Sequence, residues 1–210
     1  MKVAAISDLH GFLPDVPPCD LLLVAGDVCP VEDHDLAYQR GWLEGPFSDW
    51  LRGLDAREIV GIAGNHDFVA QADPDLMRAL PWTYLFDESV EIGGIRIHGS
   101  PWTTTFMQWA FMRDEEDLVE TWALIPDDVG VLVTHGPPYG QGDLAVHGLH
   151  VGSTTLADRR SRLERLRLHV FGHIHEAGGS LDTDGQKTIA NVSYVDFDYR
   201  PAHPAALFEL

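Results

Sequence analysis

The sequence predicts an α/β protein, and two features of its pattern lead to this prediction. Short apolar segments alternate along the chain with segments of helical length, as in folds that place helices against sheets. Five of the apolar segments end directly at a polar or glycine-bearing group. Because open α/β sheets bind ligands at the carboxyl ends of their strands, a functional site is expected at that edge.

Three of the expected strands lie in the first third of the chain, at residues 3–7, 21–25 and 58–63. Each is a nearly continuous apolar or β-branched run, which is typical of strands buried on both faces. A helix is expected over residues 35–54, where Gly41, Gly45 and Pro46 are able to interrupt it.

The rest of the chain predicts a second set of strands and two more helices. Residues 89–92 and 95–98 flank Gly93-Gly94, which indicates a hairpin. Helices are expected over residues 115–124 and 154–166. The remaining strands are expected at residues 129–134, 168–171, 187–192 and 206–209.

The composition suits a single globular domain that covers residues 1–210, with 45% apolar and 22% charged residues. Acidic residues outnumber basic residues by 33 to 14, which gives a net charge of −19. Binding to a nucleic-acid polymer needs Lys and Arg to displace counterions from the phosphates. The charge therefore disfavours a polymer partner and favours a small-molecule substrate.

The cysteines and the N-terminal residues bear on the compartment. Cys19 and Cys29 are too few for a disulfide framework and are expected to be buried free thiols. The first residues, MKVAAISDLHGF, lack the apolar length of a signal peptide, and no segment approaches the ~20 apolar residues of a membrane span. A cytoplasmic protein without a membrane partner is expected, and its oligomeric state is left open, with a dimer allowed.

The first three expected strands end in side chains that can bind metals. Asp8 and His10 are two residues apart, so in extended backbone both would point the same way. Asp27 follows Gly26, and a carboxylate has two oxygens with which to bridge two cations. Asn65 offers a neutral oxygen, and His66 could act as an acid or base near neutral pH. Taken alone, each of these motifs is as well or better explained as a turn or a cap.

Histidines end two of the later strands. His135 follows residues 129–134 and, taken alone, is better interpreted as a core histidine. His173 and His175 follow residues 168–171, and paired histidines at this spacing are more specific for a metal than a single one.

The full set of candidate ligands is more specific than any of its parts. Oxygen and imidazole groups without thiolate suit Mn, Fe, Zn, Co or Ni. Seven candidates are too many for one cation and fit a pair of divalent metal ions that share Asp27. The candidates are Asp8, His10, Asp27, Asn65, His135, His173 and His175. The other histidines are assigned to the surface or the core: His34, His98, His147, His150, His169 and His203.

This set of motifs resembles a known superfamily. From Asp8 to His175 the chain carries D-x-H, G-D, G-N-H-D, a strand-end His and G-H-x-H, in the order found in calcineurin-like metallophosphoesterases. The resemblance implies a four-layer αββα sandwich of two mixed sheets, with a dinuclear metal site at the C-terminal ends of the strands. One cation would be held by Asp8, His10, Asp27 and His175, and the other by Asp27, Asn65, His135 and His173. His66 would contact the phosphate or protonate the leaving oxygen, and Asp67 would orient His66.

A narrower resemblance points to a substrate class. The segments GSPW, THGPP, LHVFGHIHEAGG and NVS are similar to those of small metallophosphoesterase-domain proteins related to cyclic-nucleotide phosphodiesterases. Trp102, Tyr139 and His98 are candidates to line a nucleobase pocket, although core packing is the preferred interpretation. An acidic stretch at residues 32–35 is unusual after the G-D motif and could alter the mouth of the cleft.

The favoured hypothesis is hydrolysis of small phosphodiesters, such as (cyclic) nucleotides, by a hydroxide that bridges two metals and attacks phosphorus. The alternatives are a phosphomonoesterase or protein phosphatase of the same superfamily, a nuclease, or a non-catalytic metal-binding interaction module. Such a module would be marked by a missing ligand, and none is missing. A metallo-β-lactamase-like enzyme would need a clustered His-x-His-x-Asp-His, which the sequence lacks.

Overall fold

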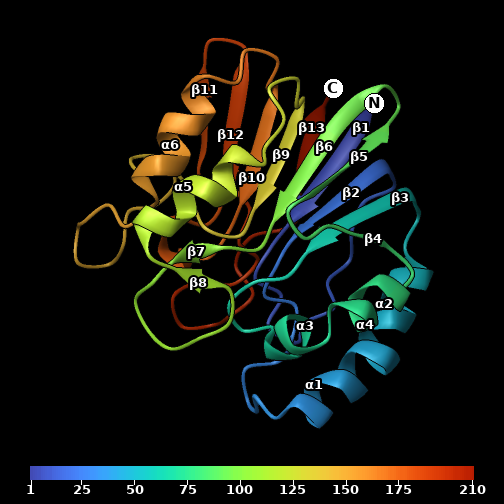
Figure 1. Cartoon of the computed structure of the whole chain (residues 1–210). Coiled ribbons are helices and arrows are strands. Elements are labelled where there is room, and N and C mark those ends of the chain that lie inside the picture. The colour runs from blue at the N-terminus through green and yellow to red at the C-terminus, as the bar shows by residue number, and fades with distance from the viewer.

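The computed structural model describes residues 1–210 and confirms an α/β fold with two large mixed sheets packed together (Figure 1). The first sheet has the order β13-β1-β2-β3-β4. Its strands are β1 (Lys2–Ile6), β2 (Cys19–Ala25), β3 (Ala56–Ile62), β4 (Thr83–Tyr84) and β13 (Ala206–Glu209). β1, β2, β3 and β4 run parallel, and β13 is antiparallel to β1.

The second sheet has the order β11-β12-β10-β9-β6-β5. Its central strands β12, β10, β9 and β6 run parallel, with antiparallel strands at both edges. The bounds are β5 (Glu88–Ile92), β6 (Ile95–Ser100), β9 (Val131–Thr134), β10 (Leu168–Phe171), β11 (Leu181–Asp184) and β12 (Lys187–Asn191). A two-stranded sheet of β7 (Thr103–Thr104) and β8 (Met112–Arg113) lies beyond the end of β6.

Both faces of the central strands are buried, as their continuous apolar sequences predicted. In β1, Val3 and Ala5 join the core between the two sheets, whereas Ala4 and Ile6 join the core on the outer side. The same alternation separates Leu21 and Leu23 from Leu22 in β2. In the second sheet it separates Val131 and Val133 from Leu132 in β9. Since successive strand residues point to opposite faces, each sheet has a second apolar face that an outer layer must cover.

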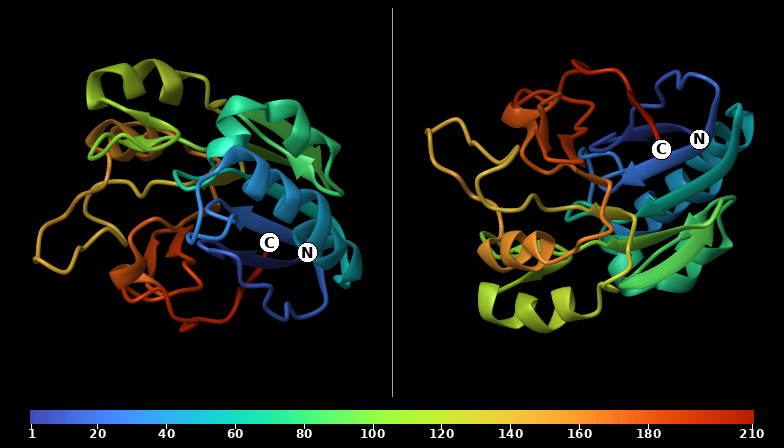
Figure 2. Two further views of the ribbon diagram at one scale, coloured as in Figure 1. Left: turned by 90° about the horizontal axis from the view of Figure 1, so that it is seen from below. Right: turned by 90° about the horizontal axis from the view of Figure 1, so that it is seen from above.

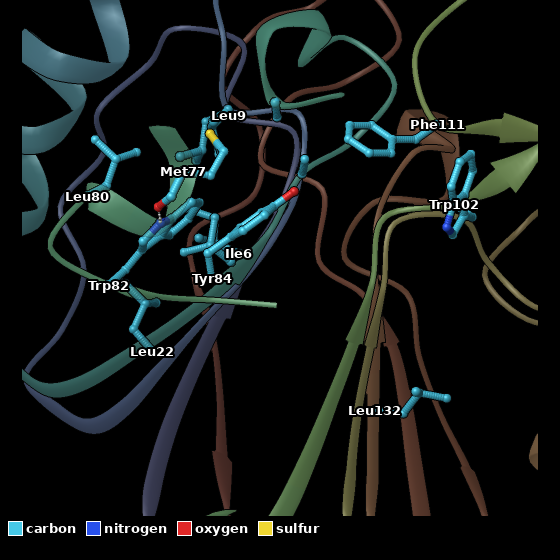
Figure 3. Packing of buried hydrophobic residues seen from close by; sticks show 14 of the residues in the cluster. Ile6, Leu9, Leu22, Met77, Leu80, Trp82, Tyr84, Trp102, Phe111 and Leu132 are labelled. Carbon is cyan, nitrogen blue, oxygen red and sulfur yellow. Dashed lines mark hydrogen bonds between the residues drawn. The ribbon is translucent and has the colours of Figure 1, made fainter. Parts of the chain in front are cut away.

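Two groups of helices form these outer layers (Figures 1 and 2). Beside the first sheet lie α1 (Leu36–Trp42), α2 (Ser48–Gly53), α3 (Phe68–Ala72) and α4 (Pro74–Ala79), and beside the second lie α5 (Glu115–Ala123) and α6 (Thr154–Ser161). Figure 3 shows the packing at the first sheet, where Trp82 donates its indole N–H to the carbonyl of Met77 at 2.8 Å and stacks on Tyr84. No helix has the length and apolarity that crossing a bilayer would require.

Two predicted helices differ from those observed. The segment expected as one helix over residues 35–54 is divided into α1, a π-helical turn at Leu43–Phe47 and α2. Pro46 lies inside this turn. Because proline has no backbone N–H to donate to the helix, the regular α-helical hydrogen bonding is interrupted there. The helix expected to reach residue 166 ends at Ser161, and the chain then turns so that Leu163 and Leu166 enter the core before β10. Cys19 and Cys29 are free and buried, as expected.

Candidate metal centre

The carboxyl ends of the parallel strands bring the predicted ligands to one edge of the two sheets. Asp8 follows β1, Asp27 follows β2, and Asn65 follows β3. His135 follows β9 in the second sheet, and His173 and His175 follow β10. All of these side chains are buried except that of His173, which is half-buried. Charged and polar groups are rarely buried together without a partner, so this concentration requires an explanation.

Asp8, His10 and His175 form the first group of converging ligand atoms. Their nearest oxygen and nitrogen atoms lie within 4.8 Å of one another. The two Nε2 atoms are 3.2 Å apart, and His175 Nε2 is 3.4 Å from Asp8 Oδ1. His10 Nε2 is also 3.8 Å from Asp27 Oδ2. Two imidazole nitrogens that converge on two carboxylates match the donor set of a divalent cation.

A second group contains Asp8, Asp27 and His135, whose ligand atoms again lie within 4.8 Å of one another. His135 donates its Nδ1–H to the carbonyl of Ala25 at 2.9 Å, which is the contact that orients a metal-binding histidine. Its Nε2 is 2.8 Å from Asn65 Oδ1 and 3.4 Å from Asp27 Oδ2.

The pKa of His135 tests whether these residues fit a cation. Burial alone would lower it, but the Asp27 carboxylate raises the pKa of His135 to about 9. In the absence of metal a second proton is therefore held on Nε2, between the imidazole and the oxygens of Asn65 and Asp27. A cation would replace that proton, because metal-binding imidazoles are neutral. The residues fit a cation at this position.

His10 and His173 are electrostatically suited to bind metal without losing a proton. Burial lowers the pKa of each to about 3, so both imidazoles are neutral at physiological pH. The ring of His173 lies 5.1 Å from that of His135 between centroids, and its backbone N–H donates to Asp8 at 3.0 Å. His173 is not in either of the two converging groups, so its role as a ligand stays a prediction.

The backbone at the site is not extended. The expectation that Asp8 and His10 point the same way because they lie two residues apart in an extended segment is therefore wrong. Asp8, His10, Asp27 and His173 all have left-handed backbone, with φ of 53°, 45°, 52° and 69°. They are four of the seven non-glycine residues with positive φ. Side chains converge because tight left-handed turns redirect them, at a cost of roughly 1–3 kcal/mol each. Strain of this kind is concentrated at functional sites.

The carboxylate of Asp67 contacts backbone N–H groups and not the imidazole of His66, so its predicted role in orienting that imidazole stays a prediction. The Asp67 carboxylate accepts hydrogen bonds from the backbone N–H groups of Val28, Cys29 and Gly64, at 3.0, 2.8 and 2.8 Å. It therefore ties the loop after β2 to the loop after β3. Burial, with a further contribution from Asp27, raises the pKa of Asp67 to about 6.

Three other residues hold the site and were not identified from the sequence. His34, which was assigned to the surface or core, places its Nε2 3.2 Å from Nδ1 of His66. Gln39 donates to the backbone carbonyl of His66 at 2.7 Å, and Ser193 donates to Asp8 Oδ2 at 2.6 Å. Ser193 belongs to the NVS segment, which was noted only for its resemblance. Each contact joins segments far apart in the chain, so local spacing could not reveal it.

A pocket of about 570 Å³ opens over these ligands. Asp27, Asn65, His66, His173 and His175 lie among its lining residues, and its apolar wall includes Phe106, Trp109, Phe197 and Tyr199. The three residues considered for a nucleobase pocket lie elsewhere. Trp102 is buried beneath Arg113 and donates to Asp87, and His98 is buried beside Ser89. Tyr139 is exposed and outside the pocket.

Gly172 provides a test of the close packing behind the ligands. A Cβ atom at this position would collide with the Asp8 carboxylate and the Ser7 hydroxyl. Gly172→Ala is expected to destabilise the protein by about 1–3 kcal/mol and to weaken metal binding. Urea unfolding and metal titration would measure both effects. The control is the helical Gly41→Ala, whose Cβ meets nothing within 4 Å, so unchanged or increased stability is expected there. Equal behaviour of the two variants would contradict this account.

The fold and the buried ligand cluster together define a metallophosphoesterase. The family model described as calcineurin-like phosphoesterase matches residues 1–177, and the chain belongs to this family. Among curated relatives, human metallophosphoesterase domain-containing protein 1 is 34% identical, over 100% of this chain and 71% of that protein. A UPF0046 protein of Caenorhabditis elegans is 27% identical, over 100% of this chain and 81% of its own length.

One solved structure supports the fold alone. GAP50, described as the anchor in the inner membrane complex of Plasmodium, superposes with a TM-score of 0.50 at 11% identity, covering 92% of this chain and 71% of that one. Membership of the family supports phosphoester hydrolysis and the binding of two divalent cations in general terms. It does not specify the substrate or the metals.

Proposed function

We propose that this protein is a dinuclear metal-dependent phosphodiesterase of small molecules, with cyclic nucleotides as one candidate group of substrates. The observation that carries the proposal is the position of the converging ligands. The imidazoles of His10, His135 and His175 meet the carboxylates of Asp8 and Asp27 below an aromatic-walled pocket that His66 also lines.

We assign the metal ligands as follows. Asp8, His10 and His175 would hold one cation, Asn65, His135 and His173 the other, and Asp27 would be shared. When bound, two such cations supply Lewis-acid polarisation of the phosphoryl group and activation of a water. The chain would hold Mn, Fe, Zn, Co or Ni, since the donors are oxygen and imidazole without thiolate.

His66 would act on the substrate from the wall of the pocket. Its backbone is held on both sides, because its N–H donates to Asp27 Oδ1 at 2.7 Å and its carbonyl accepts from Gln39. Burial lowers the pKa of His66 despite the opposing charge of Asp27. A neutral imidazole that presents an N–H to the pocket can donate to a phosphoryl oxygen or protonate a leaving oxygen.

The size and lining of the pocket favour a small substrate. Its volume of about 570 Å³ lies within the range of small-molecule sites. Phe106 and Trp109 offer aromatic faces on which a nucleobase could stack. The net charge of −19 would weaken binding to a long polyanion. We also propose that residues 1–210 act as one domain, since both sheets share one inner core.

Metal removal and reconstitution test the proposal. Chelated protein should be inactive on bis(p-nitrophenyl) phosphate and p-nitrophenyl phosphate, and at least one of Mn, Fe, Co, Zn or Ni should restore activity, with the diester hydrolysed faster. Bound metal should also stabilise the fold, by about 2.7 kcal/mol at one hundred times its Kd. Thermal denaturation would verify that the chelated protein is still folded. Failure of every metal to restore hydrolysis would contradict the proposal, and faster hydrolysis of the monoester would favour a phosphatase.

A further inference from the structure

We propose that His34 is a positioning residue for His66, and that it fixes the proton of His66 on the nitrogen that faces the substrate. This inference rests on the proposed function. His34 lies in the loop between β2 and α1, and its Nε2 is 3.2 Å from Nδ1 of His66. The two ring centroids are 5.3 Å apart, and the ring of His34 also packs on Phe68 at 4.8 Å.

The tautomer of His66 determines which of its two ring nitrogens can donate a hydrogen bond to the substrate. A neutral imidazole has one N–H and one bare nitrogen, and the hydrogen bond at one nitrogen determines the state of the other. If His34 donates to Nδ1 of His66, the proton of His66 lies on Nε2. That atom makes no hydrogen bond within the protein, and the residue lines the pocket. The opposite tautomer would present a bare nitrogen to the negatively charged phosphoryl oxygens.

His34 is the hydrogen-bond partner of the His66 ring, and the neighbouring groups are otherwise engaged. Asp27 and Gln39 contact the backbone of His66. Asp67 is turned toward backbone N–H groups. His34 itself is exposed, so its ring contacts solvent as well as His66 and Phe68.

Three variants of the metal-loaded protein, residues 1–210, test this role in turnover. His34→Phe keeps a ring against Phe68 and removes the donor, whereas His34→Gln keeps an N–H donor. Glu32→Gln is the control, an exposed residue of the same loop. His34→Phe should lower kcat by about tenfold for diphenyl phosphate, whose leaving group needs a proton, and less for bis(p-nitrophenyl) phosphate. KM and metal content should be unchanged, and His34→Gln should recover most of the rate. Equal losses on both substrates, or no recovery in His34→Gln, would overturn the proposal.

A spectroscopic measurement tests the same inference without turnover. In protein labelled with ¹⁵N-histidine and loaded with Zn, the His66 resonances are identified by their loss in His66→Gln. NMR correlation of ring protons and nitrogens should show His66 protonated on Nε2 in the wild type and shifted toward the other tautomer in His34→Phe. An unchanged tautomer in His34→Phe would overturn the role of His34 alone, whereas absence of hydrolysis with every metal would overturn the proposed function.

Discussion

Replacing Asp27 with alanine is expected to lower kcat/KM by about three orders of magnitude or more, because it would remove the carboxylate that we assign to both cations. Asp27 Oδ2 lies 3.8 Å from Nε2 of His10 and 3.4 Å from Nε2 of His135, so it faces both ligand groups. Metal analysis of the purified variant should show that both positions have lost metal, and steady-state kinetics should show the loss of rate.

The same substitution also disturbs His66, whose backbone N–H donates to Asp27 Oδ1 at 2.7 Å. Asp27→Asn separates the two effects, since an amide oxygen can still accept from His66 while the negative charge is gone. It should lose metal as Asp27→Ala does. Asp49→Ala, at an exposed position on α2 paired only with Arg52, is the matched control. An Asp27→Ala protein that kept its full metal content would contradict the bridging role.

Removing His135 or His175 is expected to empty a different metal position in each case. His175 lies with Asp8 and His10, whereas His135 lies with Asn65 and Asp27. The metal content should fall from about two per chain to about one in either variant, and kcat/KM by roughly two to three orders of magnitude, since both cations take part in such displacements.

Metal titration of His135→Ala, His175→Ala and the double variant measures how many metal ions each variant binds per chain. The double variant should bind almost no metal. His147→Ala serves as the control, because His147 lines the same pocket from an exposed loop and lies outside both ligand groups. Two cations retained in either single variant, or both lost in each, would refute the assignment of one position to each histidine.

Much of the fold followed from the periodicity of the chain. β10 and β13 are formed by the predicted residues, and the other predicted strands are found within one or two residues of their expected ends. For central strands such as β1, β2, β9 and β10, this agreement arises because both faces are buried. Burial on both faces requires a continuous run of apolar residues, and turn residues mark where the run ends. The edge strands β5 and β13 are only partly buried. Short elements such as β4, β7 and β8 were not predicted, since two-residue strands have no period of their own.

The candidate ligands could be identified from the sequence because each directly follows a predictable strand. Asp8 and Asp27 follow adjacent parallel strands, so their meeting at one edge followed from the geometry of the first sheet. His135 follows a strand of the second sheet and reaches them because the two sheets pack face to face. The contacts of Asp67 could not be foreseen in this way. Its carboxylate is taken by the N–H groups of Val28 and Cys29, and their position depends on how the loop after β2 folds.

The sequence by itself determined the α/β class, the succession along the chain of the strands that carry the site, and the residue types that can bind two cations. These properties depend on hydrophobic periodicity and on which residue ends each strand, and both are local. Only the tertiary structure decided which side chains touch. It placed His34 against His66, Ser193 on Asp8, and Phe106 and Trp109 over the ligands. Such contacts join residues that are distant in the chain, and they are set by loop packing and left-handed turns, which leave no period in the sequence.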